Sequence, residues 1–95
     1  MDIEGKVVAV TGGANGIGRA LARAFAAAGA KGVGVADLDG AGAKTVADEF
    51  GGVGYGCDVS VESDIRAFAG AVEAAFGPID IFCSNAGVPP TIPDD

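Results

Sequence analysis

Apolar positions along the chain alternate between two spacings, and this alternation predicts strands separated by helices. Short apolar runs rich in β-branched residues predict four strands, and apolar residues three and four apart predict three helices between them. The predicted strands are 6–10, 32–36, 52–57 and 79–83, and the predicted helices are about 16–28, 39–50 and 61–76. The pattern therefore predicts an α/β fold.

Each predicted helix carries an apolar face and an end signal. The apolar face of the first predicted helix consists of Ile17, Ala20, Leu21, Ala24, Phe25 and Ala28. The apolar face of the third predicted helix consists of Val61, Ile65, Phe68, Ala69, Val72 and Phe76. We expect Asp39 to cap the second helix and Ser60 to cap the third, because short polar side chains accept the first unpaired helical N–H groups.

Four strands joined by three helical crossovers specify a parallel sheet of right-handed units. We expect a doubly wound, Rossmann-like sheet with strand order 3-2-1-4 in a single domain, because 95 residues make one domain at most. In that order Cys57 and Cys83 lie on the two outer strands, so we expect no disulfide between them.

A glycine-rich turn follows the first predicted strand and opens a helix. It reads Thr11-Gly12-Gly13-Ala14-Asn15-Gly16-Ile17-Gly18. Glycines let the backbone approach an anion, and the unpaired N–H groups and dipole at the helix start favour a phosphate. Asp37 lies 19 residues beyond Gly18, at the end of the next apolar run. This is the arrangement of a dinucleotide-binding unit, in which the acid holds ribose hydroxyls.

Charge and composition exclude several other classes. A net charge of −7, from six basic and thirteen acidic residues, argues against a nucleic-acid surface and against anionic membranes. The acidic N-terminus is unlike a signal or transit peptide, and no apolar run approaches the ~20 residues of a membrane span, so we expect a cytoplasmic location. Two cysteines and no histidine predict neither a disulfide scaffold nor a metal site.

Four features in order resemble the short-chain dehydrogenase/reductase family. They are Thr11-Gly12-x-x-x-Gly16-x-Gly18, the strand-end Asp37, Cys57-Asp58-Val59 and Asn85-Ala86-Gly87. Together they cover essentially the whole chain at the family's spacing. The resemblance implies an NAD-dependent oxidoreductase that transfers hydride between NAD(H) and a small-molecule alcohol or carbonyl substrate.

The resemblance also implies which residues bind the cofactor. The glycine-rich turn would bind the pyrophosphate, and the acid after the second strand would bind the adenosine ribose. The acid after the third strand would bind the adenine amino group, and the turn after the fourth strand would lie against the nicotinamide ribose. The implied set is Gly12, Asn15, Gly16, Ile17, Gly18, Asp37, Leu38, Asp58, Val59, Asn85, Ala86 and Gly87. NAD is expected rather than NADP, because neither Asn15 nor Leu38 offers a positive charge to a 2′-phosphate.

Each of these assignments has a purely structural alternative. The glycines can form a turn without a ligand, and Asn85-Ala86-Gly87 can be an ordinary Asn-x-Gly turn. Asp37 can be a helix cap or a solvated loop acid, and Asp58 can cap the third helix. We favour the ligand for Asp37 and Asp58, because Asp39 and Ser60 are better placed as caps.

The chain departs from the family at the catalytic step. The family uses a tyrosine with a lysine four residues later, joined by an upstream serine and an asparagine. The only tyrosine here is Tyr55, and Val59 stands four residues beyond it. The chain therefore predicts no catalytic residue of its own. We expect residues 1–95 to be the N-terminal, NAD-binding part of a longer enzyme, cut before the catalytic half and inactive alone.

Two other functions stay open at this point. The chain can be a nucleotide-binding module without catalysis, or an interaction fragment whose strand 79–83 forms an open sheet edge. A Tyr-x-x-x-Lys motif downstream would decide for the enzyme, and cofactor binding would separate the two alternatives. Neither the substrate nor the oligomeric state follows from these residues.

Overall fold

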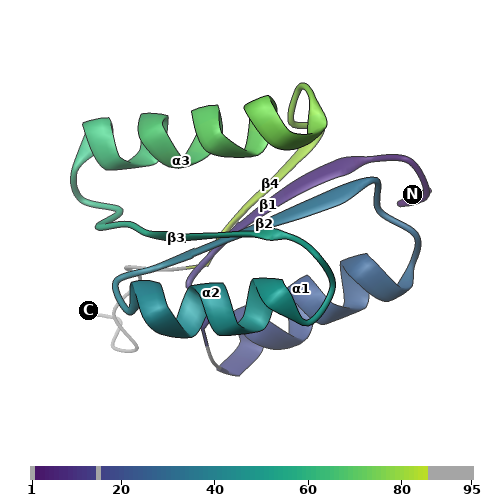
Figure 1. Ribbon diagram of the computed structural model, residues 1–95, viewed down its shortest axis with the longest axis horizontal. Helices are drawn as coiled ribbons and strands as arrows, with labels where there is room; N and C mark the ends of the chain where they lie inside the picture. The colour runs from purple at the N-terminus through teal and green to yellow at the C-terminus, as the bar shows by residue number, and fades with distance from the viewer. Residues whose placement is uncertain (1, 15, 86–95) are drawn as a thin grey trace, which may run out of the picture.

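The computed structural model describes residues 2–14 and 16–85, which form strands and helices in strict alternation (Figure 1). The elements are β1 (Val7–Thr11), α1 (Gly16–Ala27), β2 (Gly32–Asp37), α2 (Gly40–Asp48), β3 (Val53–Gly56), α3 (Glu62–Phe76) and β4 (Ile81–Ser84). All seven predicted elements are present, with ends within two residues of those predicted.

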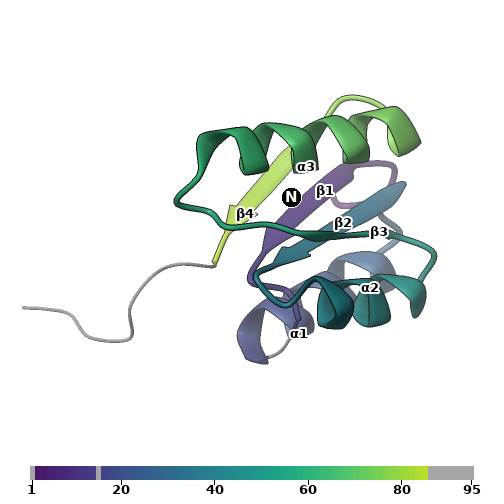
Figure 2. The same ribbon diagram turned by 60° about the vertical axis from the view of Figure 1, so that its left-hand side comes forward.

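The four strands form one parallel sheet in the order β3-β2-β1-β4, which confirms the predicted topology. Helices α1 and α2 cover one face, and α3 covers the other (Figures 1 and 2). The chain adds β2 and β3 on one side of β1 and then returns to place β4 on the other side. At such a switch point the loops leaving the strands separate and open a crevice at the carboxyl ends of the strands.

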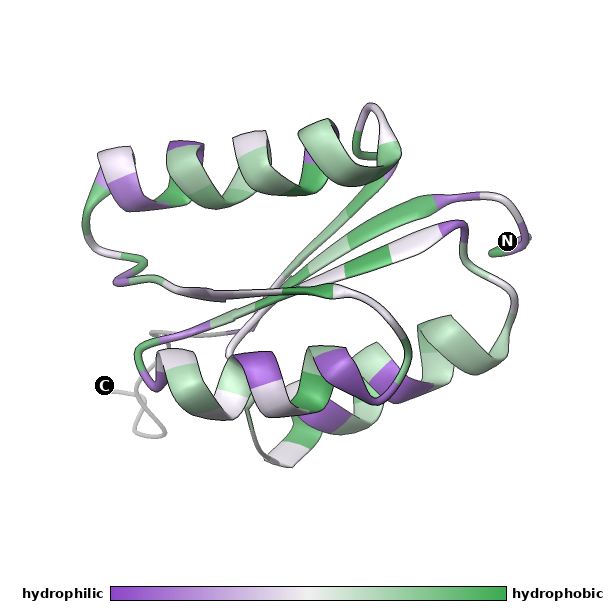
Figure 3. Cartoon of the chain, in the orientation of Figure 1, coloured by the Kyte–Doolittle hydropathy of each residue, from purple (hydrophilic) through white to green (hydrophobic). Residues whose placement is uncertain are grey.

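The core is divided by the sheet into two apolar clusters, and the central strands that contribute to both are largely apolar (Figure 3). The cluster under α1 and α2 consists of Val8, Val10, Ala22, Val33, Val35, Ala43, Val46 and Ala47. The cluster under α3 consists of Val7, Ala9, Ala36, Cys57, Phe68 and Val72. Successive β1 residues enter opposite clusters, so β1 is buried on both faces as its β-branched run predicts.

The predicted inner face of α1 is wrong by one residue around the helix. The structure buries Gly18 and Ala22, while Ile17 is 72% exposed. The exposed residues also include Ala20, Ala24 and Ala28, whereas Leu21 and Phe25 of the predicted stripe are half-buried. The physical reason is close packing. The side that approaches the sheet carries Gly18 and Ala22 beside the half-buried Leu21 and Phe25, and glycine adds no hydrophobic signal to the pattern.

One of the two predicted helix caps is confirmed, and the other is wrong. Oδ1 of Asp39 accepts a hydrogen bond from the Gly42 N–H at 2.9 Å and caps α2. The N-cap position of α3 is Val61, which makes no side-chain cap hydrogen bond. Ser60 does not cap α3, because its hydroxyl donates to Asp58 instead.

Both cysteines are expected to be free thiols. Cys57 directly follows β3 and Cys83 lies in β4, at opposite edges of the sheet. Three strand spacings give about 14 Å, twice the ~7 Å Cα separation that a disulfide tolerates. Burial raises the pKa of the Cys57 thiol, which is 3% exposed, so native alkylation should reach Cys83 first. Mass spectrometry after alkylation with and without denaturant checks both points; an oxidised intramolecular pair would contradict the strand order.

Candidate functional site

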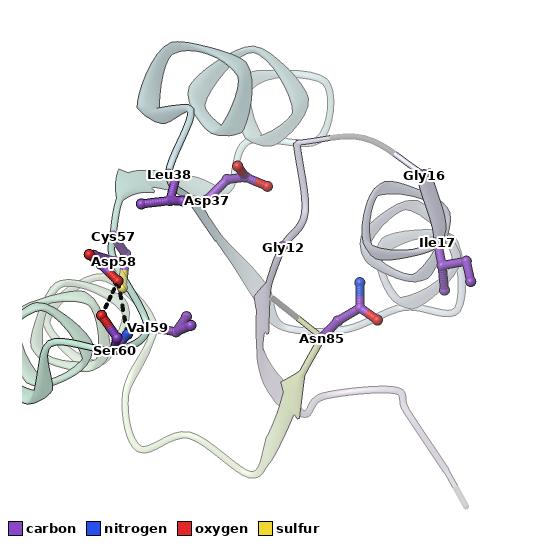
Figure 4. A pocket seen from close by; sticks show the side chains of 10 residues that line it. All are labelled: Gly12, Gly16, Ile17, Asp37, Leu38, Cys57, Asp58, Val59, Ser60 and Asn85. Carbon is purple, nitrogen blue, oxygen red and sulfur yellow. Dashed lines mark hydrogen bonds between the residues drawn. The ribbon is translucent and has the colours of Figure 1, made fainter. Parts of the chain in front are cut away.

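A cavity of about 630 Å³ lies at the carboxyl ends of the strands (Figure 4). Its volume is within the range of small-molecule and cofactor sites. A residue from the loop after every strand contributes to it. The lining residues are Gly12, Gly16, Ile17, Asp37, Leu38, Cys57, Asp58, Val59, Ser60 and Asn85. The cavity therefore occupies the switch point that the strand order creates.

The turn between β1 and α1 requires glycine for two separate reasons. Gly12 and Gly16 have φ angles of 71° and 62°, in the left-handed region that side chains disfavour. Gly18 is buried, and a Cβ there would overlap the carbonyl oxygen of Gly12 and lie 2.6 Å from its carbonyl carbon. The first helical turn of α1 thus packs directly against the glycine-rich loop that follows β1. That first turn carries no acidic side chain, so its N–H groups form a positive end open to an anion.

Asp37 ends β2 with its carboxylate fixed by the backbone. Its Oδ2 accepts from the Ala14 N–H at 3.2 Å, and its Oδ1 accepts from the Asp39 N–H at 3.0 Å. The first bond ties the end of β2 to the glycine-rich turn, 23 residues earlier. Asp37 is not the cap of α2, because Asp39 takes that role. Each carboxylate oxygen keeps a further lone pair with which to accept from a ligand.

Asp58 follows β3 and is held by hydrogen bonds from both donors of Ser60. The Ser60 hydroxyl and the Ser60 backbone N–H donate to Oδ1 of Asp58 at 2.6 and 2.9 Å. The hydroxyl bond is the main reason that the pKa of Asp58 lies below its ordinary value, and the backbone bond adds to it. Asp58 is therefore an ionised acceptor at neutral pH. Its alternative role as the cap of α3 is excluded, because Val61 occupies that position without a side-chain bond.

Asn85 lies at the end of β4 and is bound to β1 through Thr11. The Asn85 N–H donates to Oγ1 of Thr11 at 3.0 Å, and Oγ1 donates to the Cys83 carbonyl at 3.4 Å. A Cβ on Gly18 would lie 3.0 Å from the side-chain nitrogen of Asn85. The Asn85 amide is therefore positioned against the start of α1, on the side of the cavity opposite Asp37 and Leu38 (Figure 4).

The cavity brings together most of the residues that the sequence predicts for the site. Eight of them line it: Gly12, Gly16, Ile17, Asp37, Leu38, Asp58, Val59 and Asn85. Gly18 is buried beneath the turn. Asn15, Ala86 and Gly87 lie outside the described residues. The sequence did not predict Cys57 and Ser60 as lining residues, although their position on either side of Asp58–Val59 was a signal that could have identified them.

Two further properties concern the described ranges, 2–14 and 16–85. Within them, no group of three or more His, Cys, Asp or Glu side chains is arranged to hold a metal ion. No helix in the same ranges combines the length and the hydropathy needed to cross a membrane.

Comparison with known proteins gives one consistent family. A model described as short chain dehydrogenase matches residues 6–95. D-threitol dehydrogenase of Mycolicibacterium smegmatis is 44% identical over 91 residues, which are 90% of this chain and 35% of that protein. The chain thus spans about a third of the length of this relative.

Solved structures agree with this assignment. A 3-ketoacyl-(acyl-carrier-protein) reductase from Brucella melitensis complexed with NADH superimposes with a TM-score of 0.79 at 41% identity, covering 84% of this chain and 34% of that one. A structure described as ribose-5-phosphate isomerase from Brucella melitensis 16M gives a TM-score of 0.80 at 38% identity, over 92% of this chain and 34% of that one. Likeness over this segment therefore identifies the fold and family but does not fix the reaction.

Replacing Gly18 with alanine is expected to destabilise the protein by about 1–3 kcal/mol, because the new methyl group overlaps the Gly12 carbonyl. The matched control is Gly70→Ala in α3, where a Cβ would meet nothing within 4 Å. That change should stabilise by about 0.5–1 kcal/mol, since alanine is the better helix former. Denaturant unfolding of both variants measures the two effects. Equal effects of the same sign would show that the Gly18 contact is not tight.

Proposed function

The chain belongs to the short-chain dehydrogenase family, and we propose that it supplies the NAD-binding part of an oxidoreductase. The complete enzyme would transfer hydride between NAD(H) and a small-molecule alcohol or carbonyl compound. The observation that carries this proposal is the meeting of the glycine turn, Asp37, Asp58 and Asn85 around one cavity. The NADH bound to the Brucella melitensis reductase supports a nicotinamide dinucleotide as the ligand.

The residues present fit the parts of such a dinucleotide. The N–H groups at the start of α1, which the close contact of Gly18 with Gly12 sets against the end of β1, would hold the pyrophosphate. Asp37 would accept the adenosine ribose hydroxyls, because its carboxylate is already fixed at the end of β2. When bound, the nicotinamide supplies the hydride donor or acceptor. Asn15, Ala86 and Gly87 complete the proposed set of binding residues.

Apolar side chains form the rest of the proposed binding surface. Leu38 is 77% exposed and Ile17 is 72% exposed, yet both line the cavity. Exposed aliphatic groups of this size beside fixed polar groups are suited to cover the flat faces of bound rings. Asp58, with the Val59 backbone beside it, would then meet the polar edge of the adenine.

The proton-transfer groups of the proposed enzyme lie elsewhere. Tyr55 is the only tyrosine in the sequence, and it is half-buried in β3 with its ring centroid 6.3 Å from that of Phe68. It packs against the apolar cluster under α3 and does not line the cavity. We therefore propose that residues 1–95 form one dinucleotide-binding domain and that the catalytic residues belong to a further part of the protein.

One observation favours a different function. Within the described residues β4 pairs only with β1, and Phe82 on β4 is 42% exposed. An open strand edge with an exposed aromatic residue is typical of an interaction surface. A non-catalytic nucleotide-binding module or an interaction fragment is therefore the alternative. The cytoplasmic location stays a prediction, as do the absence of nucleic-acid and membrane partners.

NAD should bind at least about fivefold more tightly than NADP. The 2′-phosphate carries about −1.5 to −2 charges and would approach Asp37, with Asp39 two residues away. One pair of unit charges at 4 Å repels by about 4 kcal/mol at an effective dielectric near 20, and a quarter of that gives the fivefold difference. None of the described residues lining the cavity is basic.

The measurement is the affinity of both dinucleotides for the protein expressed from its full reading frame. Asp37→Ala should reduce the preference for NAD, because the repelling charge is removed. Asp48→Ala is the control, since Asp48 is an exposed α2 residue that, among residues 2–14 and 16–85, pairs only with Lys44. Tighter binding of NADP by the unmutated protein would overturn the choice of cofactor.

The 95-residue chain alone should transfer no hydride. Positioned acid–base groups typically accelerate proton transfer by ~10²–10⁴, and the chain offers no candidate for that step. The assay follows NADH absorbance with a panel of secondary alcohols and compares this chain with a version extended to the natural stop codon. Turnover by the short chain that Tyr55→Phe abolishes would mean that Tyr55 is catalytic and not a packing residue.

A further inference from the structure

Two hydrogen bonds of different kinds tie the loop after β1 to the end of β2. The Gly13 N–H donates to the Ala36 carbonyl at 3.1 Å, a main-chain bond that needs no side chain. The next N–H, that of Ala14, donates to Oδ2 of Asp37 at 3.2 Å. Ala14 is 8% exposed, and among residues 2–14 and 16–85 nothing else accepts from its N–H. The Asp37 side chain is therefore the partner on which this buried segment of the loop depends.

The Asp37 carboxylate is itself held in place by neighbouring N–H groups. Its Oδ1 accepts from the Asp39 N–H at 3.0 Å, and its main-chain carbonyl accepts from the Cys57 N–H at 2.9 Å. Asp37 thereby joins the loops that follow β1, β2 and β3. Figure 4 shows its carboxylate directed from β2 towards the loop that carries Gly12. A side chain restrained in this way is a fixed anchor for the Ala14 N–H.

The loop needs an anchor because glycine leaves its backbone free. Gly12 and Gly16, with φ angles of 71° and 62°, lie on either side of Ala14, and α1 begins at Gly16. Glycine populates a wide range of backbone conformations, so these positions restrain the loop little by themselves. The contact of Gly18 with Gly12 fixes the helical side of the loop, and the bond to Asp37 fixes its middle.

We propose that Asp37 is a positioning residue for the pyrophosphate as well as a ligand of the ribose. By accepting from the Ala14 N–H, it holds the loop in the conformation that presents the α1 N–H groups to a diphosphate. This inference rests on the proposed dinucleotide function and adds a second role to a residue of the same site. Without the bond, only a fraction of the molecules has the loop in the binding conformation, and the affinity falls by that fraction.

The two roles of Asp37 predict opposite results for a dinucleotide that lacks the adenosine ribose hydroxyls. If Asp37 only bound those hydroxyls, its removal would leave the affinity for such a ligand unchanged. The affinity would even rise, because a negative charge near an anionic diphosphate is lost. If Asp37 also holds the loop, its removal lowers the affinity for this ligand. The loss of one ordinary hydrogen bond corresponds to about threefold to tenfold.

The test compares NAD with its 2′,3′-dideoxyadenosine analogue, in which hydrogen replaces both hydroxyls of the adenosine ribose. Affinities are measured by titration calorimetry on the protein expressed from its full reading frame. Asp37→Ala should weaken binding of the analogue by about threefold to tenfold, and it should weaken NAD further because the hydroxyl bonds are lost as well. Asp37→Asn keeps the shape but only one acceptor oxygen, so it should act in the same direction by a smaller factor. It also serves where the alanine variant does not fold.

Asp39→Asn is the matched control for charge. It removes one negative charge two residues from Asp37 and keeps an acceptor for the Gly42 N–H that Asp39 caps. Because the Asp39 side chain gives no hydrogen bond to the loop after β1, this change should leave the affinity for the analogue within about twofold.

Hydrogen exchange of the Ala14 amide gives a readout that needs no ligand. In the ligand-free protein, NMR should detect exchange at least about threefold faster in Asp37→Ala than in the unmutated protein, because the amide has lost its acceptor. Asp39→Asn should leave this rate unchanged. A general loss of stability would instead accelerate exchange throughout the sheet.

The outcomes separate this inference from the proposed function. Unchanged or tighter binding of the analogue by the Asp37 variants, or an unchanged exchange rate at Ala14, overturns the positioning role while NAD binding by the unmutated protein upholds the proposed function. Failure of the unmutated protein to bind either dinucleotide overturns both.

Discussion

The contact between Gly18 and the carbonyl group of Gly12 fixes the geometry on which the cavity depends. It is possible only without a Cβ, and it places the first turn of α1 directly on the end of β1. The helical N–H groups then face the crevice where the strand order reverses. The same turn supplies the N–H of Ala14 to Asp37, and the Asn85 side chain lies against it. The ends of β1, β2 and β4, which lie side by side in the sheet, thereby all contact the same turn.

Glycine also allows close packing of helices on the sheet elsewhere in the fold. A Cβ on Gly34 would overlap Val72 of α3, and a Cβ on Gly32 would overlap the ring of Phe76. On the other face, a Cβ on Gly54 would overlap the Lys44 backbone of α2. The helices lie so close to the sheet that large side chains on one side fill the space left by glycine on the other. Many of the glycines are therefore packing residues, which explains how strands so rich in glycine are stable.

The sequence predicts the topology and most of the cavity, because both depend on local signals. Apolar runs mark the strands, and polar residues that follow parallel strands must meet at one edge of the sheet. The inner face of α1 could not be predicted, because hydropathy gives no weight to Gly18, whose small size decides which side packs. The role of Ser60 could not be predicted either, because its hydroxyl could hydrogen-bond either to the first N–H groups of α3 or to the Asp58 carboxylate. Asp64, six residues beyond Asp58, holds the loop in the form that favours Asp58.

The arrangement also explains how a chain with a net charge of −7 could hold the pyrophosphate of the proposed cofactor. Oriented N–H groups act over a few ångströms, whereas the charge of the whole protein acts over longer distances and is screened by salt. Asp37 ends β2, Asp58 follows β3, and both are held by N–H or hydroxyl donors in fixed directions. A carboxylate fixed in this way favours ligand groups that donate hydrogen bonds and disfavours additional anions. The same negative charge that opposes phosphate at long range would thus become a basis for selectivity at short range, since groups that donate hydrogen bonds are favoured there over a further phosphate.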